Sequence, residues 1–350
     1  MDLLARCPGS MTKGHFTIQS WTRRSASGEK GMGVDQTNES VIVGDAAVVK
    51  WATHLQQGPH PAPRRIGVLR EAGFRGMPAP WGLVTWHPPG GEATLAASVD
   101  EYLPGAVDGW TWAVELITAA ARDDRPEPAV RAATAVGSLI AELHAALART
   151  ATVASADDAR RWRDTAMATL ETVSACGDSA SVAVARARRD DIENAFDGLA
   201  ALAGTTVIEG HGDLHVGQVL RSGGRFVVTD FDGNPVLPAE ERMRPIPAAL
   251  DVAGMVQSLA HSTIVARKYT HLDLAVLTAV DSAWRAAFLD AYVERIDELG
   301  HGDIFDTAPL RAFRIQQVLR EIIYATRHLP RWMYVPDAAL PALLDEGIHS

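Results

Sequence analysis

The sequence predicts an α+β protein whose first part is built on strands and whose second part is mainly helical. Its 350 residues exceed what one hydrophobic core usually serves, and 47% of them are hydrophobic, so two domains with sizeable cores are expected. Short strand-like runs fill residues 15–103, and beyond them hydrophobic residues recur every three or four positions. We therefore expect a β-rich domain at 1–103, with a short N-terminal cap region, and a helical domain at 104–350.

The N-terminal domain is expected to contain an antiparallel sheet and one helix. Gly44 and Asp45 separate two β-branched runs, which predicts a hairpin. Farther along, Ile66 and Leu69 share one face of a helical pattern that Gly73 ends. The small-residue stretch SASGEKGMG is expected to be a loop. The expected strands lie in HFTIQSW, ESVIV, AAVVKW, WGLVTW and ATLAASVDEYL.

The C-terminal domain shows the spacing of amphipathic helices and one interruption. The helical spacing covers residues 130–147, 155–203, 250–266, 276–299 and 307–328. Between the second and third of these stretches, two β-branched runs flank Ser222, Gly223 and Gly224, which predicts a second small hairpin. His144 lies on the apolar face of its helix and is expected to be a hydrogen-bonded core histidine.

Composition indicates the class of partner. The net charge of −10 disfavours nucleic acid, which requires a basic face, and favours a small molecule. Cys7 and Cys176 are too few for a disulfide framework, and the first residues lack the pattern of a signal peptide, so a cytoplasmic protein is expected. No apolar run approaches the ~20 residues that span a bilayer, so no membrane association is expected. We expect a monomer or a homodimer.

Polar side chains gather around the second hairpin, in HGDLHVGQVLRSGGRFVVTDFDGNP. Asp213 and Gln218 precede it, and Asp230 and Asp232 follow it. A short hairpin brings its ends together, and like charges held close repel unless a cation bridges them. Oxygen ligands suit Mg²⁺, so a magnesium site is the economical explanation, and a solvated polar turn is the alternative. A zinc site on His211 and His215 is a further alternative, because histidine is the commonest metal ligand.

The same segment, with its HGDLHxGQ and DFDG motifs, resembles the catalytic segment of aminoglycoside-phosphotransferase-like kinases and is most similar to the maltokinase group. The segments EYLPGAVDGWTW, NPVLPAEERMRPIPAALDVAGM and REIIYATRHLPRW extend the resemblance over most of residues 41–335. It implies a bilobal fold of the eukaryotic protein kinase type, with ATP and Mg²⁺ as cofactors. It also implies that Asp213 is the catalytic base, that Gln218 and Asp230 bind the metal, and that Asp232 is a second acidic ligand or a substrate contact. Kinase-like loops use a histidine to hold the catalytic turn, so the resemblance favours a bracing role for His211 over a zinc site.

The resemblance gives the N-terminal domain a nucleotide-binding role. Lys50 ends an apolar strand, where such a fold places the lysine that neutralises ATP phosphates. Glu101 and Leu103 would lie in the hinge whose backbone binds adenine. No acidic residue occurs between Asp45 and Glu71, so Glu71 pairs with Lys50 or no glutamate does. The loop SGEKGMGVDQ fits neither common phosphate-loop pattern.

The resemblance is closer still to the maltokinase-like glucosamine kinases, through TDFDGNP and RWMYVPDAALPALL. It implies phosphoryl transfer from ATP to the 6-hydroxyl of D-glucosamine, with maltokinase activity forming maltose 1-phosphate or aminoglycoside phosphorylation as alternatives. Either Asp232 or Glu321 would meet the C2 amine. A metallophosphoesterase and a nucleotide-binding regulator are weaker alternatives from other classes. The expected substrate contacts are His215, Asp232, Arg242, Glu321, Tyr324, Arg327 and Trp332.

Overall fold

The computed structural model describes residues 9–32, 38–53, 55 and 58–346, and the chain forms two compact units. The first unit contains the residues up to Asp108 together with 211–213 and 218–244. The second contains 109–210, 214–217 and 245–350. The polar hairpin therefore belongs to the same unit as the N-terminal sheet, although more than 100 residues of helical chain separate them in the sequence.

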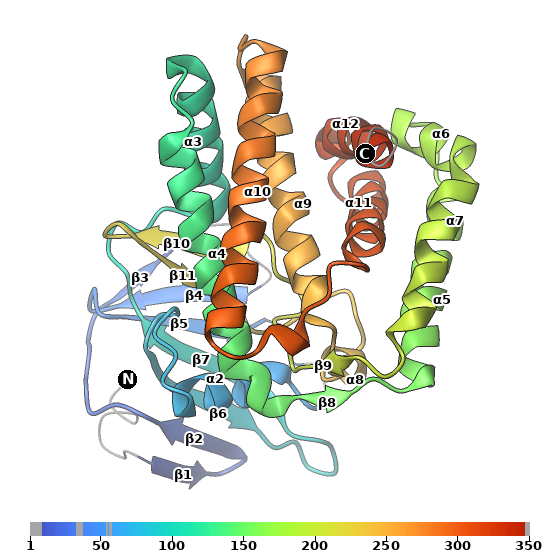
Figure 1. The fold of residues 1–350 in the computed structure, drawn as a ribbon. Coiled ribbons are helices and arrows are strands. Elements are labelled where there is room, and N and C mark those ends of the chain that lie inside the picture. Colours follow the sequence, from blue (N-terminus) through green and yellow to red (C-terminus); the bar gives the residue numbers. More distant parts are fainter. Residues whose placement is uncertain (1–8, 33–37, 54, 56–57, 347–350) are drawn as a thin grey trace. The chain divides into compact units, whose positions relative to one another are not determined.

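The described residues of the first unit form a seven-stranded antiparallel sheet in the order β1-β2-β6-β7-β5-β4-β3 (Figure 1). The expected strands are all present. Two short edge strands, β1 and β3, are additional, and β3 lies within SASGEKGMG, so the expectation of a plain loop there is wrong. The bounds are β1 (Gly9–Lys13), β2 (Phe16–Ser20), β3 (Glu29–Gly31), β4 (Asn38–Val43), β5 (Ala47–Ala52), β6 (Pro80–Trp86) and β7 (Thr94–Glu101).

Strand β5 places Lys50 on the face of the sheet opposite its apolar core. Side chains alternate along a strand, so Val49 faces the core and Lys50 faces the other way. The register pairs Lys50 with Ser98 on β7. The turn before β5 uses Gly44, where φ is +57° and a Cβ would lie 2.9 Å from the Ser27 carbonyl oxygen. Only glycine fits this turn, which fixes the start of the strand that carries Lys50.

Helix α2 (Pro61–Glu71) packs on the sheet at β6, as the apolar spacing predicts. Its N-cap His60 accepts a hydrogen bond from the Ala62 N–H, and Leu69 is fully buried. Gly73 adopts a φ of +76° just beyond the helix end. The stripe of buried side chains also includes an arginine, Arg65, which is only 3% exposed.

The second hairpin, β10 (Val219–Ser222) and β11 (Arg225–Val228), is present as expected. Gly223 and Gly224 both adopt positive φ in its two-residue turn. The hairpin is fastened to the rest of the first unit by hydrogen bonds from Val228 N–H to Gly76 O and between Arg221 and Val107. The short helix α8 (Ala239–Arg242) follows it.

The second unit is a helical bundle in which α10 packs along α4, and α9 contacts α3, α10 and α11 (Figure 1). Residues 155–203 are expected as one helical stretch but form three helices, because Ser179 caps a new helix after Gly177. Two of the helices, α3 and α12, were not predicted. The bounds are α3 (Gly109–Asp123), α4 (Glu127–Leu147), α5 (Ala156–Ser174), α6 (Ala180–Ala187), α7 (Arg189–Asp197), α9 (Ala248–Tyr269), α10 (Leu274–Glu298), α11 (Leu310–Arg327) and α12 (Tyr334–Asp345).

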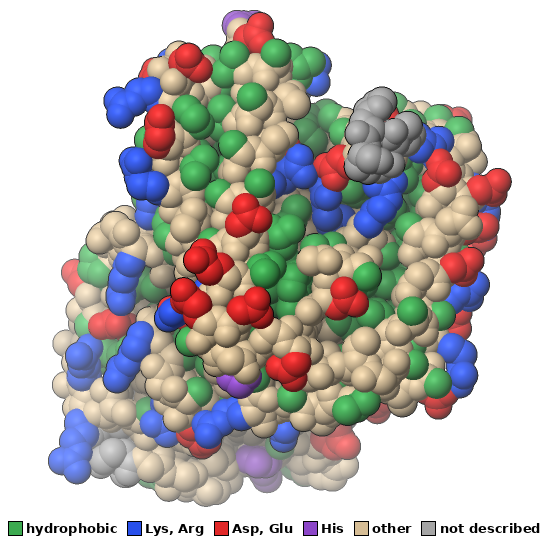
Figure 2. Space-filling model, viewed as in Figure 1, with side chains coloured by type: hydrophobic (Ala, Val, Ile, Leu, Met, Phe, Trp, Pro, Cys, Tyr) green, Lys and Arg blue, Asp and Glu red, His purple; other side chains and the backbone are tan. Residues whose placement is uncertain are grey.

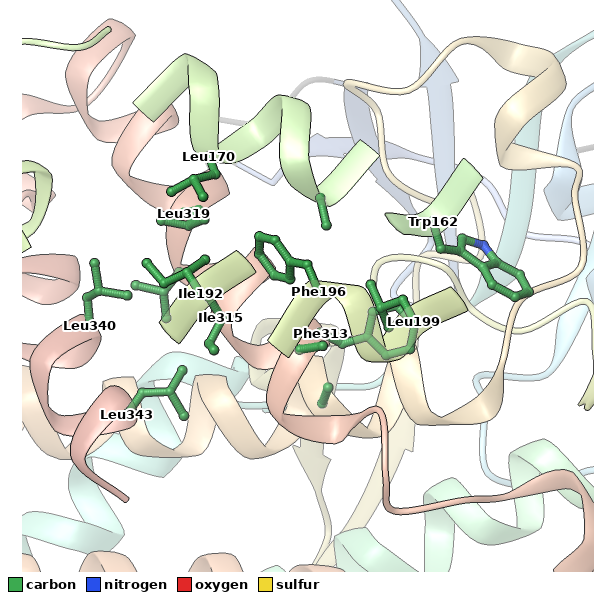
Figure 3. Packing of buried hydrophobic residues seen from close by; sticks show 14 of the residues in the cluster. Trp162, Leu170, Ile192, Phe196, Leu199, Phe313, Ile315, Leu319, Leu340 and Leu343 are labelled. Atoms are coloured by element: carbon green, nitrogen blue, oxygen red, sulfur yellow. The ribbon is translucent and has the colours of Figure 1, made fainter. Parts of the chain in front are cut away.

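Figure 3 shows part of the bundle core, where side chains from α5, α7, α11 and α12 meet. Phe196 is fully buried in this cluster together with Leu170 and Leu319. Each fully buried large side chain contributes about 1.5–3 kcal/mol relative to an exposed one. The packing fixes α11, which carries several of the expected substrate residues.

One described helix, Glu127–Thr150, is long and apolar enough to cross a membrane by length and composition, and more than half of its apolar window is buried within the fold. That burial accounts for its composition as a core helix of the bundle. In the described part of the face shown in Figure 2, basic side chains are interspersed with acidic ones and form no continuous basic patch. Cytoplasmic localisation and oligomeric state stay predictions.

Candidate active site

The first unit brings Lys50 together with two of the three aspartates of the polar hairpin. The Lys50 ammonium pairs with Asp230, and it lies 2.8 Å from Oδ2 of Asp232. The three side chains are 23%, 38% and 25% exposed, respectively. Burial by itself would lower the pKa of Lys50, but the charges of Asp232 and Asp230 outweigh it and raise the pKa, so the side chain is a cation.

Asp230 occupies a strained backbone position at the end of the hairpin. Its φ is +66°, in the left-handed region that non-glycine residues rarely adopt, and Gly233 has a φ of +70°. The two left-handed residues turn the chain sharply, so that Asp230 and Asp232 both reach Lys50. Strained residues of this kind persist where surrounding contacts hold them, and they concentrate at functional sites.

His211 braces the turn that carries Asp213. Its Nε2 lies 2.9 Å from the Thr229 carbonyl oxygen, which can only accept a hydrogen bond, so Nε2 carries the proton. Nδ1 is then free to accept from the Asp213 backbone N–H at 3.3 Å. The ring is fully buried. The expected bracing role of His211 is therefore confirmed, and both ring nitrogens are used within the protein.

A cavity of about 620 Å³ collects these groups on the polar face of the sheet. Asp213, Gln218, Asp230 and Asp232 all line it, together with Lys50 and His60. The Nε2 of Gln218 lies 3.5 Å from Oδ2 of Asp230. The sequence thus predicted correctly that three carboxylates and one amide share a small volume.

The oxygen donors of this cavity suit Mg²⁺. Asp230, Asp232 and Gln218 offer hard oxygen ligands, and the two carboxylates already share a single cation in the Lys50 ammonium. Among the described residues, no three His, Cys, Asp or Glu side chains form a cluster that could hold a metal by themselves. A magnesium site here therefore depends on the Gln218 amide and on ligands supplied from outside the protein, as is usual for Mg²⁺ bound with a nucleotide.

Burial and neighbouring charges act on the other titratable groups of the cavity. Burial lowers the pKa of His60 to about 4, so the ring is neutral near pH 7. Burial opposes ionisation of Asp232, but the charges of Lys50 and His60 lower its pKa overall. Burial lowers the pKa of Arg242, whose Nη1 donates to the Asp232 carbonyl oxygen at 3.4 Å.

The expected hinge residues lie beyond this cavity. Glu101 is the last residue of β7; its N–H donates to Ala79 O, and its carboxylate lies 3.3 Å from Arg24. The Leu103 carbonyl accepts from the Ala106 N–H. Neither residue lines the 620 Å³ cavity. Their role at adenine stays a prediction.

Glu71, the one glutamate that the sequence offered as a partner for Lys50, does not pair with it. Glu71 is exposed at the end of α2, whereas the counter-ions of Lys50 are Asp230 and Asp232. Asp100, also missed from the sequence, lines a smaller cavity of about 60 Å³ beside Lys50. Burial raises the pKa of Asp100 to about 7.

The second unit contains a separate polar site around Glu321 on α11. Oε1 of Glu321 lies 3.2 Å from Nδ1 of His261 and accepts from Gln317 at 3.3 Å. Burial alone would raise the pKa of Glu321, but His261, Gln317 and the Trp332 indole together lower it, so the carboxylate is ionised. Its other oxygen, Oε2, is buried and has no partner of regular hydrogen-bond geometry among the described residues.

A relay of side chains fixes the orientation of His261. Arg314 donates from Nε to Oε1 of Gln257, so the Gln257 amide nitrogen points to Nε2 of His261, at 2.9 Å. Because Nε2 of His261 accepts this hydrogen bond, the proton of the neutral ring lies on Nδ1, which faces Glu321. Arg314 is itself paired with Glu346 at 2.5 Å. Sequence reasoning missed His261 and Gln317, although Gln317 and Glu321 are four residues apart on one helix face.

Aromatic side chains border the Glu321 site. The Trp332 ring contacts the Trp110 ring edge-on with centroids 5.6 Å apart, and the Trp110 ring lies 6.3 Å from that of His215. His215 accepts from the Gly217 N–H at 3.0 Å, and a Cβ on Gly217 would lie 2.7 Å from the His215 ring. Gly217 therefore has to be glycine for His215 and Trp110 to pack in this way.

The remaining expected substrate residues do not join the Glu321 contacts. Tyr324 is 50% exposed, and its ring contacts His328. Arg327 is exposed near the end of α11. Arg242 belongs to the first unit, where it lines the 620 Å³ cavity.

His144 is a fully buried core residue, as expected, with Nδ1 2.8 Å from the Tyr292 hydroxyl and Nε2 3.3 Å from Asp251.

Comparison with known proteins identifies the family. No family model matches the chain. A glucosamine kinase from Mycolicibacterium smegmatis is 64% identical over 348 residues, which cover 99% of this chain and 87% of the relative. A glucosamine kinase from Streptacidiphilus jiangxiensis is 44% identical over 347 residues, covering 97% of this chain and 79% of the relative.

Solved structures agree with the sequence comparison. A glucosamine kinase in complex with glucosamine, ADP and inorganic phosphate matches with a TM-score of 0.88 and 42% identity, covering 98% of this chain and 81% of that chain. The expected bilobal kinase-like fold is thereby confirmed. With identities this high over nearly its whole length, the chain belongs to the glucosamine kinase family and is an ATP-dependent sugar kinase.

Proposed function

We propose that this protein transfers the γ-phosphoryl group of ATP to the 6-hydroxyl of D-glucosamine. The observation that carries the proposal is the ionised carboxylate of Glu321, on a side chain that is 19% exposed and bordered by Trp332. A carboxylate beside an aromatic ring suits a cationic sugar, because the ring packs on the sugar and the carboxylate accepts from its polar groups.

The nucleotide is proposed to bind at the 620 Å³ cavity of the first unit. Lys50 would bind the α- and β-phosphates of ATP. Asp230, Asp232 and Gln218 would hold Mg²⁺, and the bound ion would neutralise negative charge on the phosphates. In this structure the Lys50 ammonium pairs with both Asp230 and Asp232. Moving its ammonium to the phosphates would expose both carboxylates to the metal, so one lysine serves both states.

Asp213 is proposed as the base that takes the proton of the sugar hydroxyl. It lines the same cavity as Lys50, and its backbone N–H is held by His211. A positioned base contributes ~10²–10⁴-fold to the rate. As the phosphoryl group transfers, the proton of the 6-hydroxyl passes to a carboxylate oxygen of Asp213.

The sugar is proposed to bind against Glu321, Trp332, Trp110 and His215. These residues form one contiguous set within the second unit. His215 follows Asp213 by two positions, which limits the separation of their Cα atoms to about 7 Å whatever the arrangement of the units. Chain connectivity therefore keeps His215, one of the proposed sugar-binding residues, close to the proposed base Asp213.

Glu321 is proposed as the partner of the C2 amine in preference to Asp232. Asp232 already shares Lys50 with Asp230 and lies in the set that would hold the metal. A charge-assisted hydrogen bond contributes about 1.5–3 kcal/mol, which corresponds to roughly 10- to 150-fold in preference for glucosamine over glucose.

The test compares kcat/KM of the wild type, Glu321→Gln and Asp232→Asn on glucosamine, glucose and N-acetylglucosamine. Glu321→Gln should lose the preference for glucosamine over glucose, whereas Asp232→Asn should lower both activities together. Glu294→Gln, an exposed carboxylate on α10, is the control and should behave as wild type. Phosphorus NMR of the product reports which hydroxyl is phosphorylated.

Higher kcat/KM of the wild type on maltose or an aminoglycoside than on glucosamine would reject the proposed acceptor. A preference for glucosamine that disappears in Asp232→Asn and survives in Glu321→Gln would identify Asp232, not Glu321, as the partner of the C2 amine.

A further inference from the structure

Helix α2 carries a buried arginine that donates hydrogen bonds to two backbone carbonyls of the catalytic segments. Arg65 donates from Nη1 to the Phe231 carbonyl oxygen and from Nη2 to the Arg242 carbonyl oxygen, both at 3.0 Å. The side chain is 3% exposed. Placing a cation in the interior is costly unless its donors are satisfied in good geometry, so a specific arrangement is needed to retain it.

The two carbonyls bracket the segment that carries the acidic ligands. Phe231 lies between Asp230 and Asp232. The first hydrogen bond therefore holds the peptide group between Phe231 and Asp232. Arg242 closes the segment, and its own guanidinium donates to the Asp232 carbonyl at 3.4 Å. The guanidinium of Arg65 therefore holds both ends of the segment from Phe231 to Arg242.

The same guanidinium also lies against the turn of the catalytic base. A Cβ added to Gly212, directly before Asp213, would lie 3.3 Å from Nη2 of Arg65. A Cβ added to Gly233 would lie 3.0 Å from Nη1. The two glycines leave room for the planar group between the turn of the base and the acidic segment, so one side chain contacts both.

The strained backbone of Asp230 needs such a contact. Its φ of +66° is a strained conformation that persists only where the surrounding contacts hold it. The hydrogen bond from Arg65 acts on the carbonyl of the very next residue. On its other side, the segment is held by the hydrogen bond from Thr229 N–H to Gln218 O. Arg65 and the hairpin thus hold Asp230 from both sides.

We propose that Arg65 is a positioning residue for phosphoryl transfer: it holds the Asp230–Gly233 segment and the Asp213 turn in register, and in this protein it connects helix α2 to the active site. The proposal rests on the proposed roles of Asp213, Asp230 and Asp232. Among the described residues, the ion pairs of the Lys50 ammonium go to Asp230 and Asp232, whereas Arg65 connects helix α2 to the site through two backbone carbonyls.

Arginine suits this position better than lysine. Its planar guanidinium presents donors in a fixed fork and can bond two carbonyls at once, whereas an ammonium is a point charge on a flexible stem. Arg65→Lys should retain the charge and lose the fork. Arg65→Met should lose both and keep most of the volume. Arg64→Met, one position away and exposed, is the matched control.

The experiment measures the Mg²⁺ dependence of ADP binding by calorimetry, together with kcat and the KM for glucosamine. Loss of an outer-shell contact to a metal ligand typically weakens metal affinity by 10–100-fold. We expect the Mg²⁺ concentration that half-saturates ADP binding to rise by about 10-fold or more in Arg65→Met, with an intermediate rise in Arg65→Lys. The value of kcat should fall in the same order, and the KM for glucosamine should stay near that of wild type, because Glu321 and Trp332 belong to the other unit.

A residue that only stabilised the fold would lower the melting temperature without moving the Mg²⁺ half-saturation point of the protein that remains folded. Wild-type Mg²⁺ dependence in either Arg65 variant therefore overturns the proposal, and so does loss of cooperative melting in Arg65→Lys. Because ADP binding is measured without sugar, an enzyme that proves inactive on glucosamine would reject the proposed acceptor and leave this test intact.

Discussion

The ammonium of Lys50 lies 2.8 Å from Oδ2 of Asp232 and also pairs with Asp230, although 180 or more residues separate the lysine from the two aspartates. One cation thus bridges two carboxylates that would repel each other more strongly without it. The same two carboxylates are the proposed ligands of Mg²⁺. Lysine and metal are therefore alternative counter-ions for this pair.

Replacing Lys50 by Met should separate catalysis from metal binding. Activity should fall by at least 100-fold, because removing one preorganised charge that stabilises transferring phosphate costs ~10²–10³ in rate. In the absence of nucleotide, the variant should bind Mg²⁺ or Mn²⁺ more tightly than wild type, since the ammonium no longer competes for the carboxylates. Calorimetric titration of the metal alone measures this, with Lys13→Met as the control. Metal affinity equal to or below that of wild type would contradict the idea of alternative counter-ions.

Asp213→Asn should remove nearly all phosphoryl transfer and leave Mg·ATP binding almost unchanged. The amide cannot take the proton of the acceptor, and a positioned base contributes ~10²–10⁴-fold. Asn keeps the size of the side chain, and the His211 contact is made by the backbone N–H, so the turn should persist. Single-turnover rates and nucleotide titrations supply the two measurements. Turnover within a factor of a few of wild type would exclude Asp213 as the base.

Asp230→Asn should instead abolish Mg²⁺-dependent ATP binding. The substitution removes a carboxylate, and with it charge as well as geometry, from a site that favours a hard cation. It also removes one of the two counter-ions of Lys50. Titration of ATP with and without Mg²⁺ should show a large difference in wild type and little in the variant. Unchanged Mg·ATP affinity would reject Asp230 as a metal ligand.

The capping box of α5 predicts a pH-dependent contribution to stability. Hydrogen bonds from the side chain and backbone of Ser155 lower the pKa of Asp158 from 3.8 to about 2. Since the pKa is depressed in the fold, the stabilisation is complete above pH 3.8 and is lost as the pH falls through about 2. Asp158→Asn should lower stability near pH 7, because the amide accepts the Ser155 hydrogen bonds without the carboxylate charge.

The difference between Asp158→Asn and wild type should shrink as the pH is lowered from 5 toward about 2.5. Denaturant midpoints at each pH measure it. Asp157→Asn, in the same first turn but outside the box, should show a smaller effect. A difference that stays constant across this range would mean that ionisation of Asp158 does not support the cap.

The sequence by itself determined the division into a β-rich and a helical part, the central strands of the sheet and the chemistry of the polar hairpin. Turn signals such as Gly44 and hydrophobic spacing along 250–266 act over a few residues, so they can be recognised without the fold. Asp213, Gln218, Asp230 and Asp232 could be grouped because one short hairpin connects them. The break of 155–203 into three helices was missed because it depends on caps that compete with a continuous apolar pattern.

Only the tertiary structure decided which distant side chains meet. The sequence offered Glu71 or no glutamate as the partner of Lys50, and its counter-ions are Asp230 and Asp232 on the hairpin. Arg65 follows the spacing of the buried positions on α2, four residues before Leu69, but its partners at residues 231 and 242 have no local signal. The contact of Glu321 with His261 likewise joins two helices. Such pairs depend on packing between elements, and packing is set by the whole core rather than by neighbouring residues along the chain.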